Sequence, residues 1–353
     1  MKGDEIFMRR AIELALHGEG LTPPNPMVGC VIVSQGVIIG EGYHHRYGGP
    51  HAEVVAIESV RDPASLRGAT LYVTLEPCSH HGNTPPCADL IVEQGIGRVV
   101  MGSVDSNPLV AGRGISRLRD AGIETTTGVL SERCRQINAP FFTFHERKRP
   151  HIVLKWAETL DGFLDICRED DTTPHINWIT DPMLKTLVHR WRAATGAILA
   201  GAHTVINDNP QLTTREWPGN NPIRIILDPQ GMLDHSHKVF GREAETWLYT
   251  SGKKKMPNHV VIKQIAPDTT HLPETVLTDL YRHKVQSLIV EGGAHTLGSF
   301  IRKGLWDEAR VFVGAKCFHK GVAAPHITGT VEEVIHLGVD TLTIITNKSP
   351  QYP

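Results

Sequence analysis

The chain has 353 residues, of which 40% are hydrophobic and 21% are charged, so we expect a globular protein with two domains. The formal net charge of −2 argues against a broad nucleic-acid-binding face, although a local basic patch stays open. The first twenty residues carry charges in every turn, and no apolar run reaches the roughly 18 residues of a membrane span. We therefore expect no secretory signal, no membrane span and a cytoplasmic location.

Helical and strand patterns alternate through the first part of the chain. The predicted elements are a helix over 4–17 that Gly18 ends, a hairpin over 29–41 that turns at 34–36, a helix over 51–60, a strand over 69–75, a helix from about 88 and a strand over 98–104. This alternation predicts a sheet that is covered by helices on both faces.

The segment HERKRP, residues 145–150, is charged and ends in proline. It fits a solvated linker better than a binding patch. A second alternating series starts at residue 151 and runs nearly to the C-terminus. The predicted domains are therefore 1–146 and 150–353.

The second series carries fewer chemical motifs. Asp181 and Pro182 predict the N-cap and first residue of a helix that extends through Trp191. The run SLIVEGGAHTLGSFIRKG, residues 287–304, predicts a strand, a glycine turn and a helix. Its glycine turn either presents backbone N–H groups to a phosphate or only packs the helix on the strand. It lacks the G-x-G-x-x-G motif of Rossmann domains.

Six cysteines in a long chain without a secretory signal make a poor disulfide framework and a fair source of metal ligands. Cys78 follows the residues LEP, and eight residues separate it from Cys87. With His51 they offer one imidazole and two thiolates to Zn²⁺, which leaves the fourth tetrahedral position to water. Glu53 stands two residues beyond His51, where it can serve as a proton shuttle without binding the metal.

A structural zinc site is the alternative. Such a site usually has four protein ligands and cysteines only two to four residues apart, a spacing that this chain lacks. The fourth ligand would then be one of four histidines: His44, His45, His80 or His81. The combination of His–Ala–Glu with Pro–Cys is typical of zinc nucleobase deaminases, and it favours a catalytic site.

The wider sequence resembles one family. The stretches PNPMVGCVIV, GGPHAEVVA, YVTLEPCSHHGNTPPC and NPLVAGRG in the first half, and LKWAETLDG, NWIT, ILAGAHTVINDNPQLTTR, PIRIILD and VEGG in the second, are similar to the bifunctional pyrimidine deaminase/reductases of riboflavin biosynthesis. The resemblance implies a cytidine-deaminase-like three-layer domain followed by a dihydrofolate-reductase-like α/β domain. It also implies one Zn²⁺ per chain, NADPH as the second cofactor and a homodimer or higher homo-oligomer.

The same resemblance implies the substrate, which is 2,5-diamino-6-(5-phosphoribosylamino)pyrimidin-4-one. The first domain would remove its 2-amino group, and the second would reduce the ribosyl chain to ribityl. No nucleic acid or membrane partner is expected.

Site residues follow from the resemblance position by position. The expected zinc ligands are His51, Cys78 and Cys87, with Glu53 as the catalytic residue. The expected NADPH contacts are Ala157, Trp178, Thr204, Asp208, Gly293, Ala294, His295, Thr296, Leu297, Gly298 and Ser299. The expected substrate contacts are Asn25 in the first domain and Arg192, Leu212, Arg215 and Glu291 in the second. The two arginines suit the phosphate, because a guanidinium grips phosphate oxygens bidentately.

Three positions depart from the family pattern. Asn83 stands where a lysine or arginine is common, and Ile176 stands where a serine-like substrate contact is often found. The segment 168–177 is longer and more charged than in relatives. These departures put the corresponding substrate contacts in doubt.

Three other functions compete with this interpretation. A nucleic-acid base deaminase would share the zinc site, but it would normally keep C-x-x-C and lack the second half. A deaminase with a degenerate reductase domain would be expected to lose VEGG, NWIT or NDNPQLTTR, and all three are present. A non-catalytic scaffold would be expected to lose Glu53 or a ligand, and none is missing.

Overall fold

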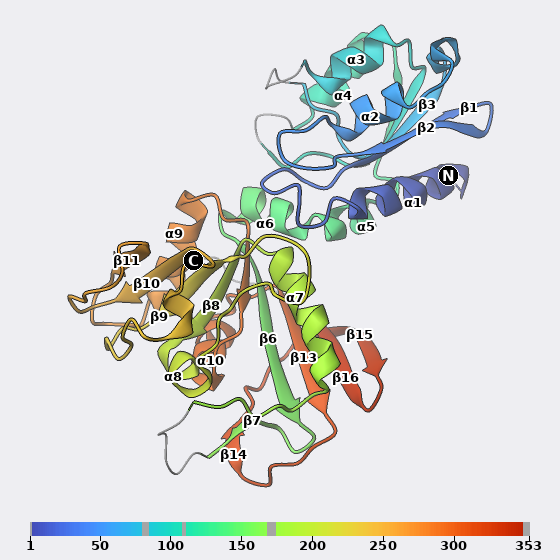
Figure 1. The fold of residues 1–353 in the computed structure, drawn as a ribbon. Coiled ribbons are helices and arrows are strands. Elements are labelled where there is room, and N and C mark those ends of the chain that lie inside the picture. Colours follow the sequence, from blue (N-terminus) through green and yellow to red (C-terminus); the bar gives the residue numbers. More distant parts are fainter. Residues whose placement is uncertain (1, 80–84, 108–110, 168–173, 349–353) are drawn as a thin grey trace. The chain divides into compact units, whose positions relative to one another are not determined.

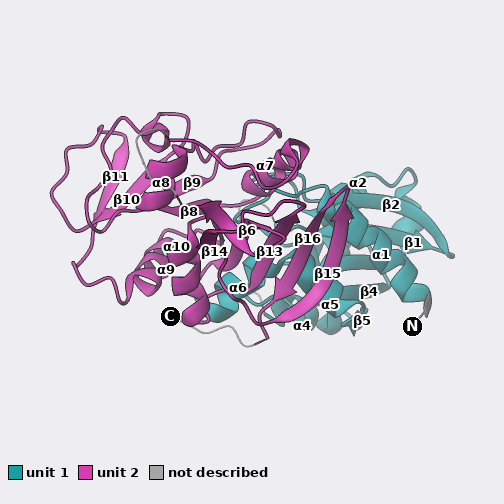
Figure 2. Cartoon of the chain, turned by 90° about the horizontal axis from the view of Figure 1, so that it is seen from below, with its two compact units in different colours: residues 1–148 teal, residues 149–353 magenta. Residues whose placement is uncertain are grey.

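The computed structural model of the chain describes residues 2–79, 85–107, 111–167 and 174–348. The chain divides into two compact units, Met1–Lys148 and Arg149–Pro353 (Figure 2). The predicted boundary, between residues 146 and 150, lies at this division. Each unit contains its own sheet (Figure 1).

Unit 1 alternates helices and strands. Its elements are α1 (Lys2–Leu16), β1 (Gly29–Ser34), β2 (Val37–Tyr43), α2 (Ala52–Glu58), the 3₁₀ helix η1 (Pro63–Leu66), β3 (Thr70–Leu75), α3 (Cys87–Glu93), β4 (Arg98–Ser103), α4 (Arg113–Asp120), β5 (Glu124–Thr127), α5 (Ser131–Ile137) and α6 (Ala139–Arg147). Every element predicted from the sequence here is present, with ends shifted by up to two residues.

The sheet of unit 1 has the order β2-β1-β3-β4-β5 and forms the middle of three layers, which confirms the predicted architecture. Strands β1 and β2 pair antiparallel, whereas β3, β4 and β5 run parallel. Side chains alternate between the faces because a strand has a period of two. Cys30 and Ile32 face the cluster built with α2, α3 and α4, whereas Val31 and Val33 face α1 and α5.

Glycines let two helices approach this sheet closely. A Cβ on Gly29 of β1 would lie 1.9 Å from the Ala11 carbonyl oxygen of α1, and one on Gly42 of β2 would lie 2.4 Å from the Ala56 nitrogen of α2. Only glycine fits at such distances. The second approach is the one that brings the start of α2, and with it His51, against the sheet.

Unit 2 is a larger α/β unit. Its elements are β6 (His151–Thr159), β7 (Phe163–Ile166), η2 (Pro182–Leu184), α7 (Lys185–Ala193), β8 (Ala197–Gly201), α8 (Ala202–Asp208), β9 (Ile223–Leu227), η3 (Lys238–Phe240), β10 (Thr246–Thr250), β11 (Val260–Gln264), α9 (Leu272–Arg282), β12 (Ser287–Val290), α10 (Ala294–Arg302), β13 (Glu308–Gly314), β14 (Gly321–Ala323), β15 (Thr330–Leu337) and β16 (Asp340–Thr346). The predicted strand, turn and helix over 287–304 are confirmed as β12 and α10.

The main sheet of unit 2 has the order β11-β10-β9-β8-β12-β6-β13-β16-β15. Seven neighbouring strands, from β11 to β13, are parallel, and β16 and β15 add an antiparallel edge. Helices α9 and α10 pack with one face, where Leu199 and Ile225 point. Helix α8 packs with the other, where Ile198 and Ile226 point. The cores on both faces explain why these strands are almost wholly apolar.

The predicted N-cap at Asp181 is confirmed, but the first turn of the predicted helix is not α-helical. The Asp181 carboxylate accepts a hydrogen bond from the Met183 backbone nitrogen at 2.8 Å. The first turn is the 3₁₀ helix η2, and the α-helix α7 continues from Lys185.

The predicted solvated linker at 145–150 is wrong. Helix α6 continues through Arg147, and Arg149 is fully buried in unit 2. The Arg149 guanidinium donates from Nη1 and Nη2 to the Asp307 carboxylate at 2.5 and 2.8 Å, and Ile152 donates its backbone N–H to the same carboxylate at 2.9 Å. A run of charged residues in the sequence does not reveal that one of them, Arg149, forms a buried ion pair with a residue more than 150 positions away.

Breaking this pair should destabilise unit 2. Arg149→Ala removes the guanidinium from the buried Asp307 carboxylate, and loss of one member of a buried ion pair costs about 3–5 kcal/mol. All six tryptophans lie in unit 2, so denaturant unfolding followed by tryptophan fluorescence reports on this unit alone. The control Arg282→Ala removes an exposed arginine at the end of α9 and should change stability by less than about 0.5 kcal/mol. Equal effects of the two substitutions would show that the buried pair contributes nothing.

Candidate active sites

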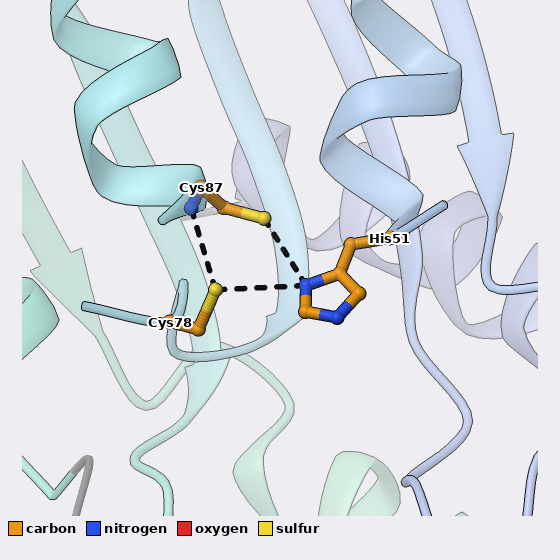
Figure 3. A group of neighbouring side chains, drawn as sticks. All are labelled: His51, Cys78 and Cys87. Carbon is orange, nitrogen blue, oxygen red and sulfur yellow. Dashed lines mark hydrogen bonds between the residues drawn. The ribbon is translucent and has the colours of Figure 1, made fainter. Parts of the chain in front are cut away.

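Three potential metal ligands meet on one face of the sheet of unit 1. His51 is the N-cap residue of α2, Cys87 is the first residue of α3, and Cys78 lies three residues beyond the end of β3 (Figure 3). Helices α2 and α3 flank β3 on the same face, so their first turns point toward the end of that strand. Within the described ranges this is the only group of His, Cys, Asp or Glu side chains with metal-binding geometry.

The distances fit a tetrahedral zinc ion. His51 Nδ1 lies 3.2 Å from Cys87 Sγ and 3.5 Å from Cys78 Sγ, and all three ligand atoms lie within 4.8 Å of one another. Bonds of about 2.0–2.1 Å to nitrogen and about 2.3 Å to sulfur at a tetrahedral angle would place these atoms about 3.6 Å apart. The cluster therefore has the size of a three-ligand zinc site.

Hydrogen bonds within the cluster prepare Cys78 as a thiolate. Hydrogen bonds from the Cys87 thiol and from His51 lower the pKa of Cys78 to about 4, against the effect of burial. The backbone N–H of Cys87 also donates to Cys78 Sγ at 3.3 Å. The bond to Cys78 and burial raise the pKa of Cys87. A dication bound between the two sulfurs would release the Cys87 proton, because metal binding and thiol deprotonation are coupled.

Glu53 lies beside this cluster in a small cavity. The cavity measures about 150 Å³ and is lined by Asn25, Pro26, Val28, His44, His51, Ala52, Glu53, Leu75, Glu76, Cys78, Asp105 and Phe141. An engineered apolar cavity of about this size takes up benzene, so the space suits a single six-membered ring. Burial raises the pKa of Glu53 to about 7, and the neighbouring Cys78 adds to the effect. A carboxyl group with such a pKa can both take and give a proton near neutral pH.

Asn25 and His44 form one wall of the cavity. His44 Nδ1 lies 2.8 Å from the Pro50 carbonyl oxygen, which can only accept, so this nitrogen carries the proton. Burial lowers the pKa of His44, so the ring is neutral and its Nε2 accepts from Asn25 Nδ2 at 3.1 Å. The Asn25 amide is thereby oriented with its Oδ1 away from His44.

The structure distinguishes among the histidines named as alternative fourth ligands. His44 is buried and belongs to the cavity wall. His45 is exposed, with its ring centroid 4.1 Å from that of Tyr43. His80, His81 and the departing Asn83 lie outside the described residues.

Glu76 is a residue that the sequence interpretation missed. Its buried carboxylate accepts hydrogen bonds from the backbone nitrogens of Asp105, Gly112, Gly114 and Ile115, at 2.9 to 3.3 Å. Two of these donors lie in the connection between β4 and α4 and two in the first turn of α4, so Glu76 joins the start of α4 to the end of β3. The sequence signal that could have identified Glu76 is a glutamate directly after a buried strand.

In unit 2, the expected cofactor contacts gather at the carboxyl ends of three parallel strands. Ala157 lies near the end of β6, while β8 and β12 lead directly into α8 and α10. The strands are neighbours in the order β8-β12-β6, so Thr204 and Gly293 come together, and the Gly293 N–H donates to Thr204 Oγ1 at 2.8 Å. Asp208 ends α8. Ligands of open α/β sheets bind at this kind of edge.

The expected cofactor contacts differ in exposure, and therefore in which of their atoms a ligand can reach. Trp178 is exposed, and the Lys185 ammonium lies 3.9 Å from the centre of its ring. Thr296 and Leu297 are buried, and the Leu297 side chain belongs to the core. Leu297 can therefore meet a ligand only through its backbone. Exposed Gly293 and His295 lie at the start of α10.

Two expected substrate contacts are already paired with each other. The Arg192 guanidinium donates to both Glu291 carboxylate oxygens, at 3.1 and 2.7 Å, and to the Thr213 carbonyl oxygen at 3.2 Å. Their side chains are only 11% and 8% exposed. Three of the five N–H groups of this arginine are therefore occupied. This pairing differs from the expected role of Arg192 as a phosphate clamp, because its charge is already balanced.

Lys155 is a second residue that the sequence interpretation missed. It stands two residues before Ala157 on β6, so both side chains point to the same face. Although burial raises the pKa of Glu291, the charges of Arg192 and Lys155 lower it to about 2. Burial in turn lowers the pKa of Lys155. The sequence signal that could have identified Lys155 is a lysine within the apolar run HIVLKWA.

Leu212 and Arg215 lie on the connection between α8 and β9. Arg215 is exposed, and its Nη1 donates to Thr213 Oγ1 at 2.9 Å. Leu212 is buried and has a φ of 51°. Ile176 is exposed, and the rest of the departing segment 168–177 is described only from residue 174.

Two family models match the chain. The cytidine and deoxycytidylate deaminase zinc-binding region matches residues 1–103, and the RibD C-terminal domain matches residues 150–334. The riboflavin biosynthesis protein RibD of Aquifex aeolicus is 42% identical over 326 residues, which cover 91% of this chain and 89% of that protein. RibD of Escherichia coli is 40% identical over 329 residues, with coverages of 89% and 88%.

This chain belongs to the RibD family. It is a deaminase and reductase of riboflavin biosynthesis, with zinc and NADPH as cofactors. A solved structure from Thermotoga maritima, a diaminohydroxyphosphoribosylaminopyrimidine deaminase/5-amino-6-(5-phosphoribosylamino)uracil reductase, has a TM-score of 0.88 and 41% identity, and the match covers 98% of this chain and 99% of that one. RibD of Acinetobacter baumannii has a TM-score of 0.87 and 32% identity, with 99% of each chain covered.

The RibD match spans both halves, which argues against a nucleic-acid base deaminase and against a deaminase with a degenerate reductase domain. Among the helices of the described residues, none combines the length and apolar character that a membrane crossing requires. The oligomeric state stays a prediction.

The zinc content tests the metal cluster of this RibD chain directly. We expect about one zinc per chain, and Cys87→Ser should remove most of it, because a serine hydroxyl is a poor zinc ligand. The control Cys134→Ala changes a buried cysteine of the same unit outside the cluster and should leave the stoichiometry unchanged. Metal analysis after dialysis measures both. A fully loaded Cys87→Ser variant would contradict the ligand assignment.

Proposed function

We propose that unit 1 deaminates 2,5-diamino-6-(5-phosphoribosylamino)pyrimidin-4-one and that unit 2 reduces the product, 5-amino-6-(5-phosphoribosylamino)uracil, to its ribityl form. The metal cluster beside a one-ring cavity supports the first activity. The division of the two activities between residues 1–146 and 150–353 is supported by the two family matches, over residues 1–103 and 150–334. The observation that carries the proposal is the position of buried Glu53 next to three convergent zinc ligands.

In the deaminase site, we assign His51, Cys78 and Cys87 as zinc ligands. Bound zinc would lower the pKa of water and so supply a nucleophile near neutral pH. The Glu53 carboxylate would take a proton from the attacking water, pass it to a ring nitrogen, and then assist the departure of ammonia. Its pKa of about 7 suits both directions of transfer.

The cavity walls would hold the pyrimidine in place. Because Asn25 donates its amide to His44, its Oδ1 is left to accept a hydrogen bond from the ring. Val28, Leu75 and Phe141 supply apolar surface and belong to one cluster. They would limit the entry of bulk water, which strengthens the electrostatic interactions of the site.

Glu53→Gln should abolish deamination while the protein keeps its zinc and its reductase activity. The substitution removes only the group that moves protons, and such groups typically contribute about 10²–10⁴-fold to the rate. The control Glu58→Gln alters an exposed glutamate of the same helix and should leave the rate within about twofold. Ammonia release, zinc content and NADPH oxidation are measured on the same preparations. Wild-type ammonia release by Glu53→Gln would refute the role of Glu53.

In the reductase site, NADPH would supply the hydride, and the protein would align the reactants. We assign Arg215 as the contact to the substrate phosphate, because its side chain is exposed and its Nη1 donates to a neutral acceptor, Thr213 Oγ1. Arg192 would hold Glu291 in place through their bidentate pair. The Glu291 carboxylate, which stays charged at neutral pH, would accept hydrogen bonds from the ribosyl hydroxyls.

Arg215→Ala should narrow the preference for the phosphorylated substrate over its dephosphorylated form. A charge-assisted hydrogen bond contributes about 1.5–3 kcal/mol, so kcat/KM for the phosphorylated substrate should fall roughly 10- to 150-fold. Arg215→Lys should recover only part, because an ammonium lacks the planar fork. The control Arg242→Ala removes another exposed arginine of unit 2. If all variants keep the wild-type phosphate preference, Arg215 does not bind the phosphate.

A further inference from the structure

The loop that carries Leu212 and Arg215 is held in an unfavourable backbone conformation. Leu212 has a φ of 51°, in the left-handed region that costs a residue with a side chain about 1–2 kcal/mol. Leu212 is nevertheless only 3% exposed. Such conformations persist only where the surroundings fix them, and they concentrate at ligand sites.

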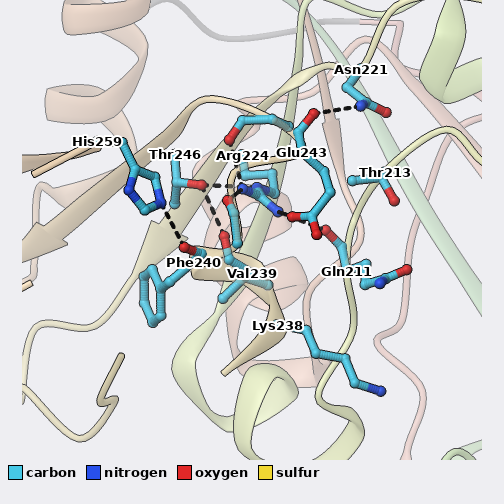
Figure 4. Close-up of polar contacts among 12 residues, drawn as sticks. Gln211, Thr213, Asn221, Arg224, Lys238, Val239, Phe240, Glu243, Thr246 and His259 are labelled. Atoms are coloured by element: carbon cyan, nitrogen blue, oxygen red, sulfur yellow. Dashed lines mark hydrogen bonds and ion pairs between the residues drawn. The ribbon is translucent and has the colours of Figure 1, made fainter. Parts of the chain in front are cut away.

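Two arginines, one fully and one mostly buried, fix the carbonyl groups on either side of Leu212. Arg192 donates to the Thr213 carbonyl oxygen at 3.2 Å. Arg224 is fully buried and donates to the Gln211 carbonyl oxygen at 3.3 Å, and further to Thr246 Oγ1 and to the Gly241 and Ala244 carbonyl oxygens (Figure 4). The first half of the loop is therefore anchored through its acceptors.

The second half is anchored through its donors, by a histidine of α7. The His189 ring nitrogen Nδ1 lies 2.7 Å from the Arg215 backbone nitrogen and 3.2 Å from that of Glu216. His189 itself is only 3% exposed. Both backbone N–H groups thus donate to one ring nitrogen, which accepts only when it carries no proton.

We infer that His189 is a positioning residue of the reductase, which holds Arg215 in place for the substrate phosphate by accepting two backbone N–H groups of its loop. The inference rests on the proposed role of Arg215 and adds the residue on which that role depends. Without this acceptor, the N–H groups of Arg215 and Glu216 would lose their partner, and the loop would have to reorganise before it could bind substrate.

The charges around His189 keep its ring neutral. Arg192 lies on the same helix, Arg215 and Glu216 lie on the loop, and Glu291 follows β12. Burial first, and then Arg192 and Arg215, lower the pKa of His189 to about 4, and the two glutamates oppose this only in part. The folded-state pKa lies below the ordinary value of about 6.5. The neutral ring therefore stabilises the fold above about pH 6.5, and this contribution is lost as the pH falls toward 4.

Two substitutions separate positioning from packing. His189→Leu removes the acceptor, whereas His189→Asn keeps one, because asparagine places Oδ1 two bonds from Cβ, as histidine places Nδ1. We expect His189→Leu to raise KM for the phosphorylated uracil substrate roughly 5- to 150-fold, the cost of leaving two partly buried N–H groups without an acceptor. The Kd for NADPH should stay within about twofold. His189→Asn should restore most of the KM, even if the smaller side chain lowers stability.

A matched control addresses general destabilisation. His259 donates from Nε2 to the Phe240 carbonyl oxygen at 2.8 Å in another loop of unit 2 (Figure 4). His259→Leu should lower stability without raising KM. The nitrogen NMR signals of His189 should show a neutral ring protonated on Nε2 at pH 6, and stability should fall more steeply in the wild type than in His189→Asn between about pH 6.5 and 4.

The outcomes distinguish this inference from the proposed function. If Arg215→Ala impairs phosphate recognition but His189→Leu leaves KM unchanged, the positioning role is wrong and the phosphate contact stands. A His189 ring protonated on Nδ1 at pH 6 would also overturn the inference. If His189→Asn is as impaired as His189→Leu, the ring acts through packing. If Arg215→Ala has no effect, the proposed phosphate contact fails, and the inference fails with it.

Discussion

Both sites depend on one constraint, which is that neighbouring parallel strands end at the same edge of a sheet. In unit 1, the ends of β3 and β4 are in register at Leu75 and Ser103, so the residues that follow them meet. In unit 2, β8, β12 and β6 are parallel neighbours, and the segments that leave them hold the expected cofactor contacts. Hydrophobic side chains on both faces stabilise these strands, while the chain segments beyond their ends are left to carry chemistry.

Burial has opposite consequences for two carboxyl groups of this protein. Glu53 is buried beside a sulfur that is easily ionised, and its pKa rises to about 7. Glu291 is buried as well, but the charges of Arg192 and Lys155 lower its pKa to about 2. The first environment suits a group that transfers protons, and the second suits one that stays charged and binds hydroxyl groups. The neighbours, and not burial alone, decide which function a buried carboxyl group can have.

Near both sites, a buried side chain holds a neighbouring chain segment by accepting hydrogen bonds from its backbone N–H groups. Glu76, which directly follows β3, accepts four backbone N–H groups from the connection between β4 and α4 and from the first turn of α4, and His189 of α7 accepts two from the loop before β9. In each case a buried side chain supplies acceptors for backbone N–H groups that have no partner within their own segment. Buried backbone donors need such partners, so the loops are tied to rigid elements while their exposed side chains remain available for ligands.

The sequence by itself determined the main elements of the fold and the chemistry of the metal cluster. Hydrophobic periods of two and 3.6 depend on local geometry, so the α-helices and strands of unit 1 from α1 to β4 and the β12–α10 turn were predictable. His51, Glu53, Cys78 and Cys87 stood out because few other functions use those residue types at that spacing. The resemblance to the family then supplied the reductase residues, which local patterns did not single out.

Only the tertiary structure decided which charged residues are free and which are paired. Arg149 looked like part of a solvated linker and is buried against Asp307, and Arg192 looked like a phosphate clamp and is paired with Glu291. The anchoring roles of Glu76 and His189 were hidden for the same reason. Each depends on a partner that lies from 26 to 158 residues away, and no local pattern encodes a contact at that separation. Residue type and spacing are properties of the sequence, whereas burial and pairing exist only once the chain has folded.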